Sequence, residues 1–499
     1  MLDRWFHLRE RGTTVNREAA AGLTTFMAMA YIIFVNPAIL AAAGVPFHAA
    51  IVATCFTAGL ITILMGVFAN YPLALASGMG LNAMVAFGIV AKYQASWQTA
   101  MAVVALEGLA VLLLSLSPLR AAVMRAIPED LKLAIGVGIG LFIAHIGLQQ
   151  SRLVVASPAT LVTFGDIRDS AAMLSVFGLA LTISLMARKV PGALLIGIVL
   201  TAALGCAPGV RLIPAAPESL WIVIALGLAL GVALGLARVP GAPLWGALGA
   251  VLIACAPPFR LFGALTQNPF SAEARAQNFQ TFFAADFRTL FRWEVFKVLG
   301  PVAFAFFMTD FFDTMGTALG VGRQAGFVDE KGMIPRIRAL LCVDSLGALL
   351  GGLFGCSSVT SYIESAAGVA VGGRTGLANI VTGLAFWASL FFLPLIAIVG
   401  GGIPVGENAY AYPATAPALI VVGFLMIAEA RRIDFSSIET GLPAFLTIVS
   451  LPLTFSISHG IALGFISHCL IQIVRGRWRE THPFLYASAA LFVAMFFIA

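Results

Sequence analysis

The sequence predicts an all-α polytopic membrane protein, built from two sets of seven spans related as an inverted repeat. Three observations indicate this fold class. Of the 499 residues, 60% are hydrophobic and only 10% are charged, which lies far outside the range of water-soluble domains. Continuously apolar runs, each of roughly the 20 residues that cross a bilayer as a helix, recur along the chain. Two of these runs, at corresponding places in the two sets, are poor in large residues.

The basic residues between the apolar runs predict the orientation of the spans. With Arg4, Arg9, Arg11 and Arg17 in the cytoplasm, the basic clusters of the other short loops also fall inside, as the positive-inside rule requires. We therefore expect a multi-pass protein of the bacterial inner membrane, with a cytoplasmic N-terminus and no cleaved signal peptide. Because each set has an odd number of spans, the second set is inverted. The predicted spans are 19–42, 48–69, 73–91, 99–117, 131–148, 170–187 and 192–206, then 298–319, 335–355, 358–371, 376–399, 414–429, 441–456 and 459–475.

One segment between the two sets occurs twice. ARKVPGALLIGIVLTAALGCAP at 187–208 returns, one residue shorter, as ARVPGAPLWGALGAVLIACAP at 237–257. We interpret 219–257 as a duplicated hairpin, which brings the chain to about 16 spans and preserves the orientation of the second set. The long segment 258–297 is expected as an outer loop. The final apolar run, 483–499, has the length either to span the bilayer or to lie in its interface.

Ionisable side chains inside the apolar runs are few. Each costs on the order of a few kcal/mol unless it is paired, protonated or hydrated, so function is the default explanation. We assign function to Asp313 and Glu364, and we expect Glu107, Asp310 and Asp344 to serve packing and hydrogen bonding within the bundle. The histidines are expected to act as packing donors. The complete set is Glu107, His145, Asp310, Asp313, Asp344, Glu364, His459 and His468.

Neither a metal site nor nucleic-acid binding is indicated. The six cysteines lie in or at the ends of apolar runs, and none has the spacing of metal ligands. The net charge of +6 arises from short basic clusters between spans, whose expected role is membrane topology. We therefore expect no metal, no nucleic-acid partner and no cofactor.

Two segments rich in small residues predict broken spans. LALASGMGLNAM at 73–84 lies in the third span of the first set, and CSSVTSYIESAAGVAVGG at 356–373 lies in the third span of the second. We expect each to contain extended chain that opens into a half-helix, in the second case at Glu364. Interrupted helices at matching places in inverted halves point to the binding site of a transporter, because half-helix ends present free N–H groups at mid-membrane.

These segments resemble one transporter family. TDFFDTMGTALGVGRQAGFVDEKGMIPRIRALLCVDSLGALLGGLFGCSSVTSYIESAAGVAVGGRTGLANIVTG is similar to the signature of AzgA-like purine permeases, within the nucleobase-ascorbate transporter superfamily. AGLTTFMAMAYIIFVNPAIL, YPLALASGMGLNAMVAF and GLPAFLTIVSLPLTFSISHGIALGFI are similar as well, so the resemblance covers nearly the whole chain. The duplicated hairpin departs from the family's usual fourteen-span pattern.

The resemblance implies a core domain that binds substrate and moves against a gate domain. It implies uptake of hypoxanthine, guanine or adenine together with protons, in a bilayer, and it leaves open whether the chain forms a homodimer. The implied domains are an N-terminus at 1–18, a core at 19–130 and 298–399, a gate at 131–297 and 400–475, and a C-terminal segment at 476–499.

The resemblance also implies the residues of the site. A flat, neutral base with alternating donors and acceptors suits a carboxylate that accepts N–H bonds, and a carboxylate shielded from water can bind and release the coupling proton. We assign base recognition mainly to Glu364 and proton coupling mainly to Asp313, although both carboxylates are candidates for both roles. The implied substrate-binding residues are Glu364, Asp313, Tyr362, Asn82, Gly80 and Thr317.

Other functions stay open. The same architecture could carry uracil, xanthine or an inorganic anion, but an anion carrier is expected to replace a core carboxylate by a neutral or basic residue. An intramembrane aspartyl protease using Asp310, Asp313 or Asp344 is the alternative from another class. No catalytic pair stands in the expected setting, and an inverted repeat has no use in that mechanism. We therefore expect a transporter and not an enzyme.

Overall fold

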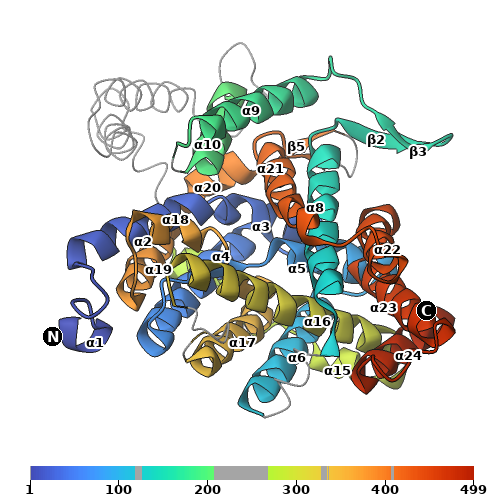
Figure 1. Cartoon of the computed structure of the whole chain (residues 1–499). Helices are drawn as coiled ribbons and strands as arrows, with labels where there is room; N and C mark the ends of the chain where they lie inside the picture. Colours follow the sequence, from blue (N-terminus) through green and yellow to red (C-terminus); the bar gives the residue numbers. More distant parts are fainter. Residues whose placement is uncertain are drawn as a thin grey trace, which may run out of the picture.

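The structure is a computed structural model that describes residues 2–117, 126–190, 192–206, 268–327, 334, 336–405 and 410–498. Within these residues, nine helices have the length and apolar composition needed to cross a membrane, and four shorter apolar helices accompany them. The described chain is thus a mostly helical, polytopic membrane protein (Figure 1), as the sequence predicts. The duplicated hairpin predicted at 219–257 lies outside the described residues, so the predicted number of spans stays a prediction.

The elements follow the predicted spans closely. The predicted run 170–187 coincides with α9, for example. In the first half the elements are α1 (Leu2–Phe6), α2 (Val15–Met29), α3 (Ile32–Ala41), α4 (Phe47–Leu64) with a π-helical turn (Met65–Ala69), β1 (Leu75–Ser77), α5 (Met79–Ala83) with a π-helical extension (Met84–Ala91), α6 (Trp97–Leu116), α8 (Glu129–Gln150), β2 (Val154–Ser157), β3 (Leu161–Phe164), α9 (Ser170–Ala187) and α10 (Ala193–Gly205). In the second half they are α14 (Ala272–Asn278), α15 (Phe287–Leu290), α16 (Trp293–Gln324), α17 (Ile337–Phe354), β4 (Val359–Ser361), α18 (Ser365–Val371), α19 (Gly376–Ser389), α20 (Leu393–Gly400), β5 (Ile403–Pro404), β6 (Tyr410–Ala411), α21 (Ala416–Ile427), α22 (Ile438–Thr454), α23 (Ile457–Val474) and α24 (Pro483–Ile498).

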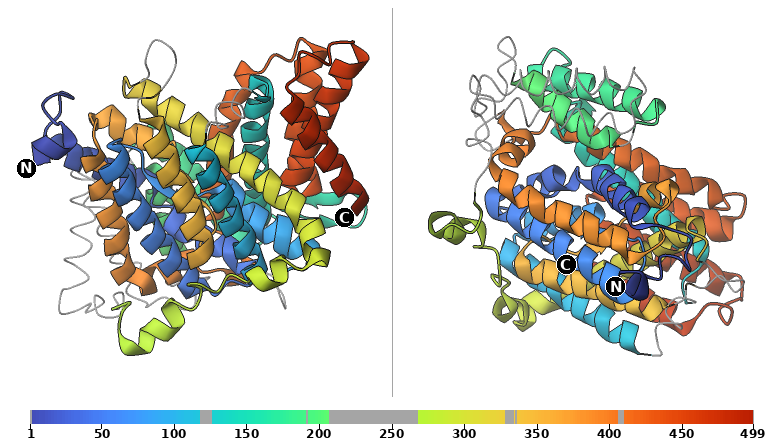
Figure 2. Two further views of the ribbon diagram at one scale, coloured as in Figure 1. Left: turned by 90° about the horizontal axis from the view of Figure 1, so that it is seen from below. Right: turned by 90° about the vertical axis from the view of Figure 1, so that its left-hand side faces the viewer.

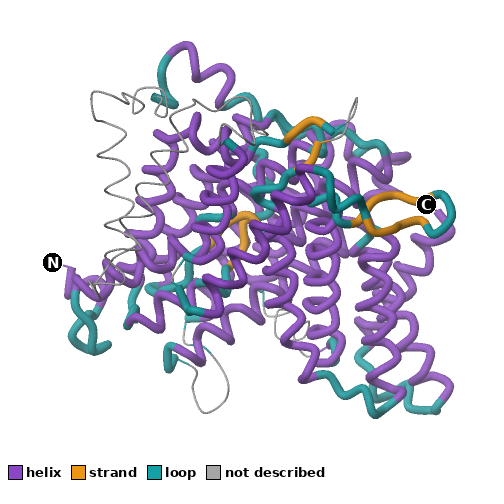
Figure 3. Tube along the Cα trace, turned by 90° about the horizontal axis from the view of Figure 1, so that it is seen from above, coloured by secondary structure: helices purple, strands orange, loops and turns teal. Residues whose placement is uncertain are grey.

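Both predicted broken spans contain extended chain. β1 precedes α5, β4 precedes α18, and the two strands pair antiparallel with Leu75 opposite Ser361. Every residue of both strands is buried, so the ribbon lies among the helices and not at the surface (Figure 3). Backbone without a helical partner is tolerated at membrane depth only where protein covers it, and here the two strands satisfy each other.

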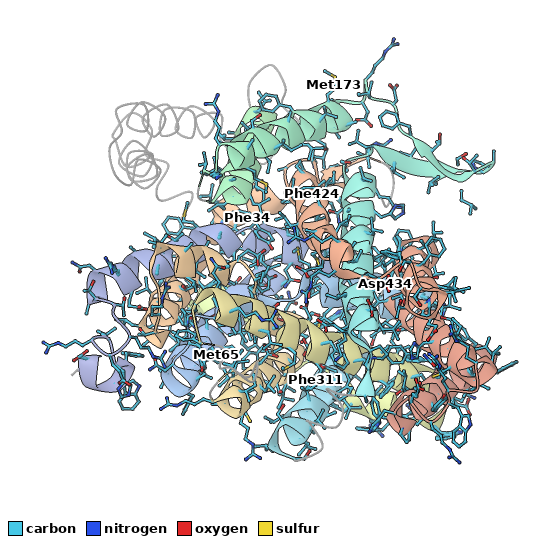
Figure 4. The ribbon with its side chains drawn as sticks, viewed as in Figure 1. Phe34, Met65, Met173, Phe311, Phe424 and Asp434 are labelled. Atoms are coloured by element: carbon cyan, nitrogen blue, oxygen red, sulfur yellow. The ribbon has the colours of Figure 1, made fainter. Side chains whose placement is uncertain are left out.

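The helices form two groups. The first helix group, α2–α6 and α16–α20, contains β1 and β4, and the second helix group comprises α8–α10 and α21–α23. In Figure 2 (left), the blue and gold helices of the first group stand to one side of the red and teal helices of the second. In Figure 4, Phe34, Met65 and Phe311 lie in the first group, whereas Phe424 and Asp434 lie with the second.

Glycines bring α6 and α17 into backbone contact in the first helix group. A Cβ atom on Gly108 of α6 would lie 2.3 Å from the Leu349 nitrogen of α17, and one on Gly352 of α17 would lie 2.5 Å from the Ala105 nitrogen. Close approach of two helices through small residues is the common way in which membrane helices associate. It fixes Glu107, the neighbour of Gly108, against α17.

The last helix, α24, packs against both helix groups. Phe492 is fully buried, and its ring lies 5.7 Å from that of Phe304 on α16 and 5.9 Å from that of Phe465 on α23. The Tyr486 hydroxyl donates to the Trp478 carbonyl just after α23, while Phe496 contacts His459 near the beginning of α23. α24 therefore runs antiparallel along α23, as a packed helix.

Two short hairpins were not predicted. β2 and β3 pair through Val154 opposite Phe164, and β5 and β6 pair through Ile403 opposite Ala411. In Figure 1, β2 and β3 extend away from the helices. The β-branched residues around a Ser-Pro-Ala-Thr turn favour this hairpin locally, but such a short signal between long apolar runs is easily read as a loop.

Candidate functional site

A cavity of about 90 Å³ lies between the two helix groups, beside the β1–β4 ribbon. Its two walls differ in chemistry. The wall from the second helix group is aliphatic and consists of Ile139 and Ile143 of α8 and Val422 and Met426 of α21. The opposite wall, from the first helix group, carries the polar side chains Tyr31, Thr309, Asp313, Thr317, Thr360, Ser361, Tyr362 and Glu364. A mostly apolar pocket with a few convergent polar groups is the usual form of a small-molecule site.

Glu364 lies at the beginning of α18, where the chain leaves β4. Its carboxylate is held from another span, because the Tyr31 hydroxyl donates a 2.6 Å hydrogen bond to Oε1. Tyr31 is fully buried and occupies the break between α2 and α3. Within the described residues, Tyr31 is the side chain that donates to this carboxylate, and Glu364 lines the cavity.

Tyr362 is fixed across the ribbon. Its hydroxyl donates to the Ser77 carbonyl at 2.5 Å, and its backbone nitrogen donates to the Ala74 carbonyl at 3.0 Å. Tyr362 lines the cavity, and because its hydroxyl is already used, its ring is what it has left to offer a ligand. An aromatic face suits a flat ligand.

Asp313 projects from α16 into the same cavity and is half-buried. Within the described residues its carboxylate accepts no hydrogen bond and contacts no basic side chain. Beside it, Gly316 of α16 faces open space, since a Cβ there would meet no atom within 4 Å. Asp313 is thus free to accept a hydrogen bond from a ligand or to take up a proton.

The structure brings five of the six predicted site residues together. Gly80, Asp313, Thr317, Tyr362 and Glu364 all line the cavity. The sixth, Asn82, is fully buried behind the wall, and neither its amide nitrogen nor its amide oxygen has a hydrogen-bond partner in the described chain.

Asp344 supports the site from behind. Its Oδ1 accepts hydrogen bonds from the backbone nitrogen and the hydroxyl of Ser361, and its Oδ2 accepts one from Thr314 at 2.6 Å. The Thr314 hydroxyl also lies 2.7 Å from that of Thr360. Asp344 therefore anchors strand β4 to α16 and α17, in agreement with the bonding role expected for it.

Sequence reasoning missed Tyr31, Thr309, Thr360 and Ser361 as wall residues. Uncharged hydroxyls in apolar runs cost little and give little signal. For Tyr31 the available signal was a single hydroxyl in the run AYIIFVNPAIL, ahead of a helix-interrupting proline.

No basic side chain lines the cavity, and no lysine or arginine is buried anywhere in the described chain. The same residues contain no group of three or more His, Cys, Asp or Glu that could hold a metal ion. The field at the cavity is therefore set by carboxylates, hydroxyls and backbone dipoles. This arrangement suits a neutral or cationic ligand better than an anion.

Comparison of folds places the chain beside known transporters. It superposes on the transmembrane domain of the cyanobacterial bicarbonate transporter BicA with a TM-score of 0.55 at 15% identity, covering 89% of this chain and 97% of that one. For the transporter SLC26A9 the TM-score is 0.54 at 10% identity, covering 92% of this chain and 66% of that one. At these identities the likeness concerns the fold alone.

Comparison of sequences shows the family as well as the fold. The chain is 38% identical to the guanine/hypoxanthine permease PbuO of Bacillus subtilis, covering 99% of this chain and all of that protein. It is 37% identical to the adenine permease AdeP of Escherichia coli, covering 99% and 95%. The model of the permease family Xan_ur_permease matches residues 16–463. The resemblance carried by the sequence motifs is thereby confirmed, and the chain belongs to this permease family.

Proposed function

We propose that the protein is a secondary active transporter that takes up a purine nucleobase, hypoxanthine, guanine or adenine, together with a proton. The observation that carries the proposal is the cavity in which Glu364 and Asp313 face an aliphatic wall. Relatives whose names specify guanine, hypoxanthine or adenine support the choice of purine.

The chemistry of the polar wall fits a purine. Glu364 would accept N–H bonds from the base, and the Tyr362 ring would contact its face. Thr317 and the backbone at Gly80 would supply further polar contacts, and Asn82 would act from behind the wall. The aliphatic wall offers no directional bond, so the second helix group can slide past a bound base without breaking one.

We also propose the 7+7 inverted repeat, with the first helix group as core and the second as gate. If the two halves are inverted copies, each contact between a span of one half and a span of the other should have a counterpart in which the halves are swapped, and such contacts are present. β1 of the third span bonds β4 of the tenth. A Cβ on Gly66, at the end of the second span, would lie 2.4 Å from the Gly376 oxygen of the eleventh span. In the same way, a Cβ on Gly352 of the ninth span would lie 2.5 Å from the Ala105 nitrogen of the fourth span. Alternating access then follows from movement of the core against the gate.

A panel of labelled substrates tests the cargo. In a bacterial strain without purine uptake of its own, expression of this chain should restore uptake of hypoxanthine, guanine or adenine into the cell. Glu364→Gln should weaken that uptake, whereas Glu480→Gln, which changes an exposed carboxylate, should not. Accumulation of uracil, xanthine or bicarbonate without hypoxanthine, guanine or adenine would refute the proposed choice of substrate.

Substitution of Asp313 tests the coupling of substrate uptake to protons. Asp313→Asn removes the exchangeable proton but keeps the shape of the side chain, so it should abolish accumulation driven by a pH gradient and spare purine exchange. Asp434→Asn, at an exposed turn, is the matched control. Normal concentrative uptake by Asp313→Asn would contradict the role of Asp313 in proton coupling.

We place the protein in the bacterial plasma membrane, with its N-terminus in the cytoplasm. A protease site added before Leu2 should be cut in inside-out vesicles and protected in intact cells. Cleavage in intact cells with protection in the vesicles would reverse the topology.

A further inference from the structure

Two carboxyl groups meet behind the cavity without lining it. Glu107 of α6 is 1% exposed and Asp310 of α16 is 0% exposed. Neither belongs to the cavity wall, although Asp310 stands one helical turn before Asp313. The contact of α6 with α17 through Gly108 and Gly352 holds Glu107 in this position.

Within the described chain, the two carboxyl groups lie within hydrogen-bonding reach of each other. None of their four oxygens has a hydrogen-bond donor there. The Thr360 hydroxyl also lies near Asp310, but it donates to the Thr314 hydroxyl at 2.7 Å, because Thr314 gives its own proton to Asp344. A carboxylate oxygen can only accept, so a bond between two carboxyl groups requires that one of them carry a proton.

The surroundings offer no other way to balance the charge. Within the residues that the structure describes, the charged groups facing the pair are Asp344 of α17 and Asp313 of α16, which are themselves acidic, and α6 contributes none besides Glu107. Asp344 differs from the pair because three donors satisfy it, so it can remain ionised. Two buried carboxylates in contact, without a cation, cannot both be ionised.

We propose that Glu107 and Asp310 form a second proton-binding site, a carboxylic acid and a carboxylate that share one proton throughout the transport cycle. The pair ties α6 to α16 and limits the negative charge behind the substrate site. Because both groups are shut off from solvent and from the cavity, the shared proton does not exchange with either side. Only the contrast with an exchanging proton on Asp313 rests on the proposed function.

Infrared spectroscopy of the purified protein tests the shared proton directly. Wild-type protein should retain the C=O absorption of a protonated carboxyl at about pH 8, where exposed carboxyls are ionised. That absorption should diminish in Glu107→Gln and in Asp310→Asn, because an amide N–H replaces the shared proton as donor. Glu480→Gln should leave it unchanged. Absence of the absorption in the wild type, or its persistence at full strength in both variants, would overturn the proposal.

A transport measurement separates a resident proton from a coupling proton. Glu107→Gln should keep the number of protons carried per substrate, whereas Glu107→Ala should lower the melting temperature, because it leaves Asp310 without a donor. Loss of proton-driven accumulation in Glu107→Gln, with exchange preserved, would overturn the claim that the proton is retained. If the wild type carried no purine, the proposed function would fail, but the infrared result would still decide whether the pair shares a proton.

Discussion

The carboxylate of Glu364 owes its position to a residue 333 positions away in the sequence. The Tyr31 hydroxyl holds Oε1 and so fixes the carboxylate at the cavity wall. A hydrogen bond to a charged group contributes about 1.5–3 kcal/mol, and removing this one would leave Glu364 free to rotate. Tyr31 is therefore a positioning residue.

Tyr31→Phe keeps the ring and removes only the donor. We expect the KM for the transported base to rise about tenfold, in line with a loss of about 1.4 kcal/mol in binding, while the maximal rate changes less. Tyr410→Phe, which changes a ring that is 59% exposed, is the matched control. Uptake kinetics in the complemented strain measure both variants, and an unchanged KM for Tyr31→Phe would contradict the positioning role.

The difference between Asp313 and Tyr31 shows what a sequence reveals at this scale. A charged residue in an apolar run is costly, so a functional role for Asp313 and Glu364 could be predicted from the sequence alone. Tyr31 carries no such penalty, and its partner is distant in sequence, so no local pattern connects the two. The interaction between Glu107 and Asp310 is also invisible locally, because it depends on which faces of α6 and α16 meet.

At the scale of elements, the broken spans and the helix contacts have the same origin in small residues. Stretches of small residues rich in Gly and Ser predicted both breaks, because Gly and Ser have a lower helix propensity than Ala or Leu. The pairing of β1 with β4 required the antiparallel approach of two spans, and its register could not be predicted from either segment alone. The predicted helix bounds agree well because apolar runs end where charged or proline-rich loops begin. The β2–β3 hairpin was missed because its signal is short.

The contact between α6 and α17 is the element most sensitive to a single added carbon. Gly108→Ala would place a Cβ 2.3 Å from a backbone nitrogen, so the helices must separate. We expect a loss of about 1–3 kcal/mol in stability, as for other overpacked sites, seen as a lower melting temperature in detergent. Gly136→Ala on α8 meets no atom within 4 Å and should be neutral or slightly stabilising. Equal melting temperatures for the two variants would contradict this packing.

At the scale of the whole molecule, α24 connects the two groups that we propose to move. It contacts α16 in the first helix group and α23 in the second, and it lies beyond residues 16–463, which match the permease family. A helix that packs on both groups limits their relative displacement unless it moves with one of them. Lys92 adds a second connection, since its amine lies 2.7 Å from the His459 ring of α23.

Phe492 is the central contact of α24. Phe492→Ala should weaken the packing of α24 on α16 and α23 by about 3–5 kcal/mol, because the buried ring loses its contacts with both. Phe497→Ala, at a side chain that is 88% exposed, is the control. Proteolysis of the purified protein should release the C-terminal segment faster from Phe492→Ala than from Phe497→Ala. Equal rates would show that Phe492 does not hold the helix.

During synthesis of the protein, strand β1 cannot pair until strand β4 has been made. Leu75 meets its partner Ser361 only after about 290 further residues have been made. At about 5–20 residues per second, that delay is roughly 15–60 s. Throughout that interval the first broken span has backbone N–H and C=O groups without their final partners, which hydrocarbon does not tolerate. The nascent first half must therefore be sheltered, by the insertion machinery or by its own earlier spans, until the ribbon closes.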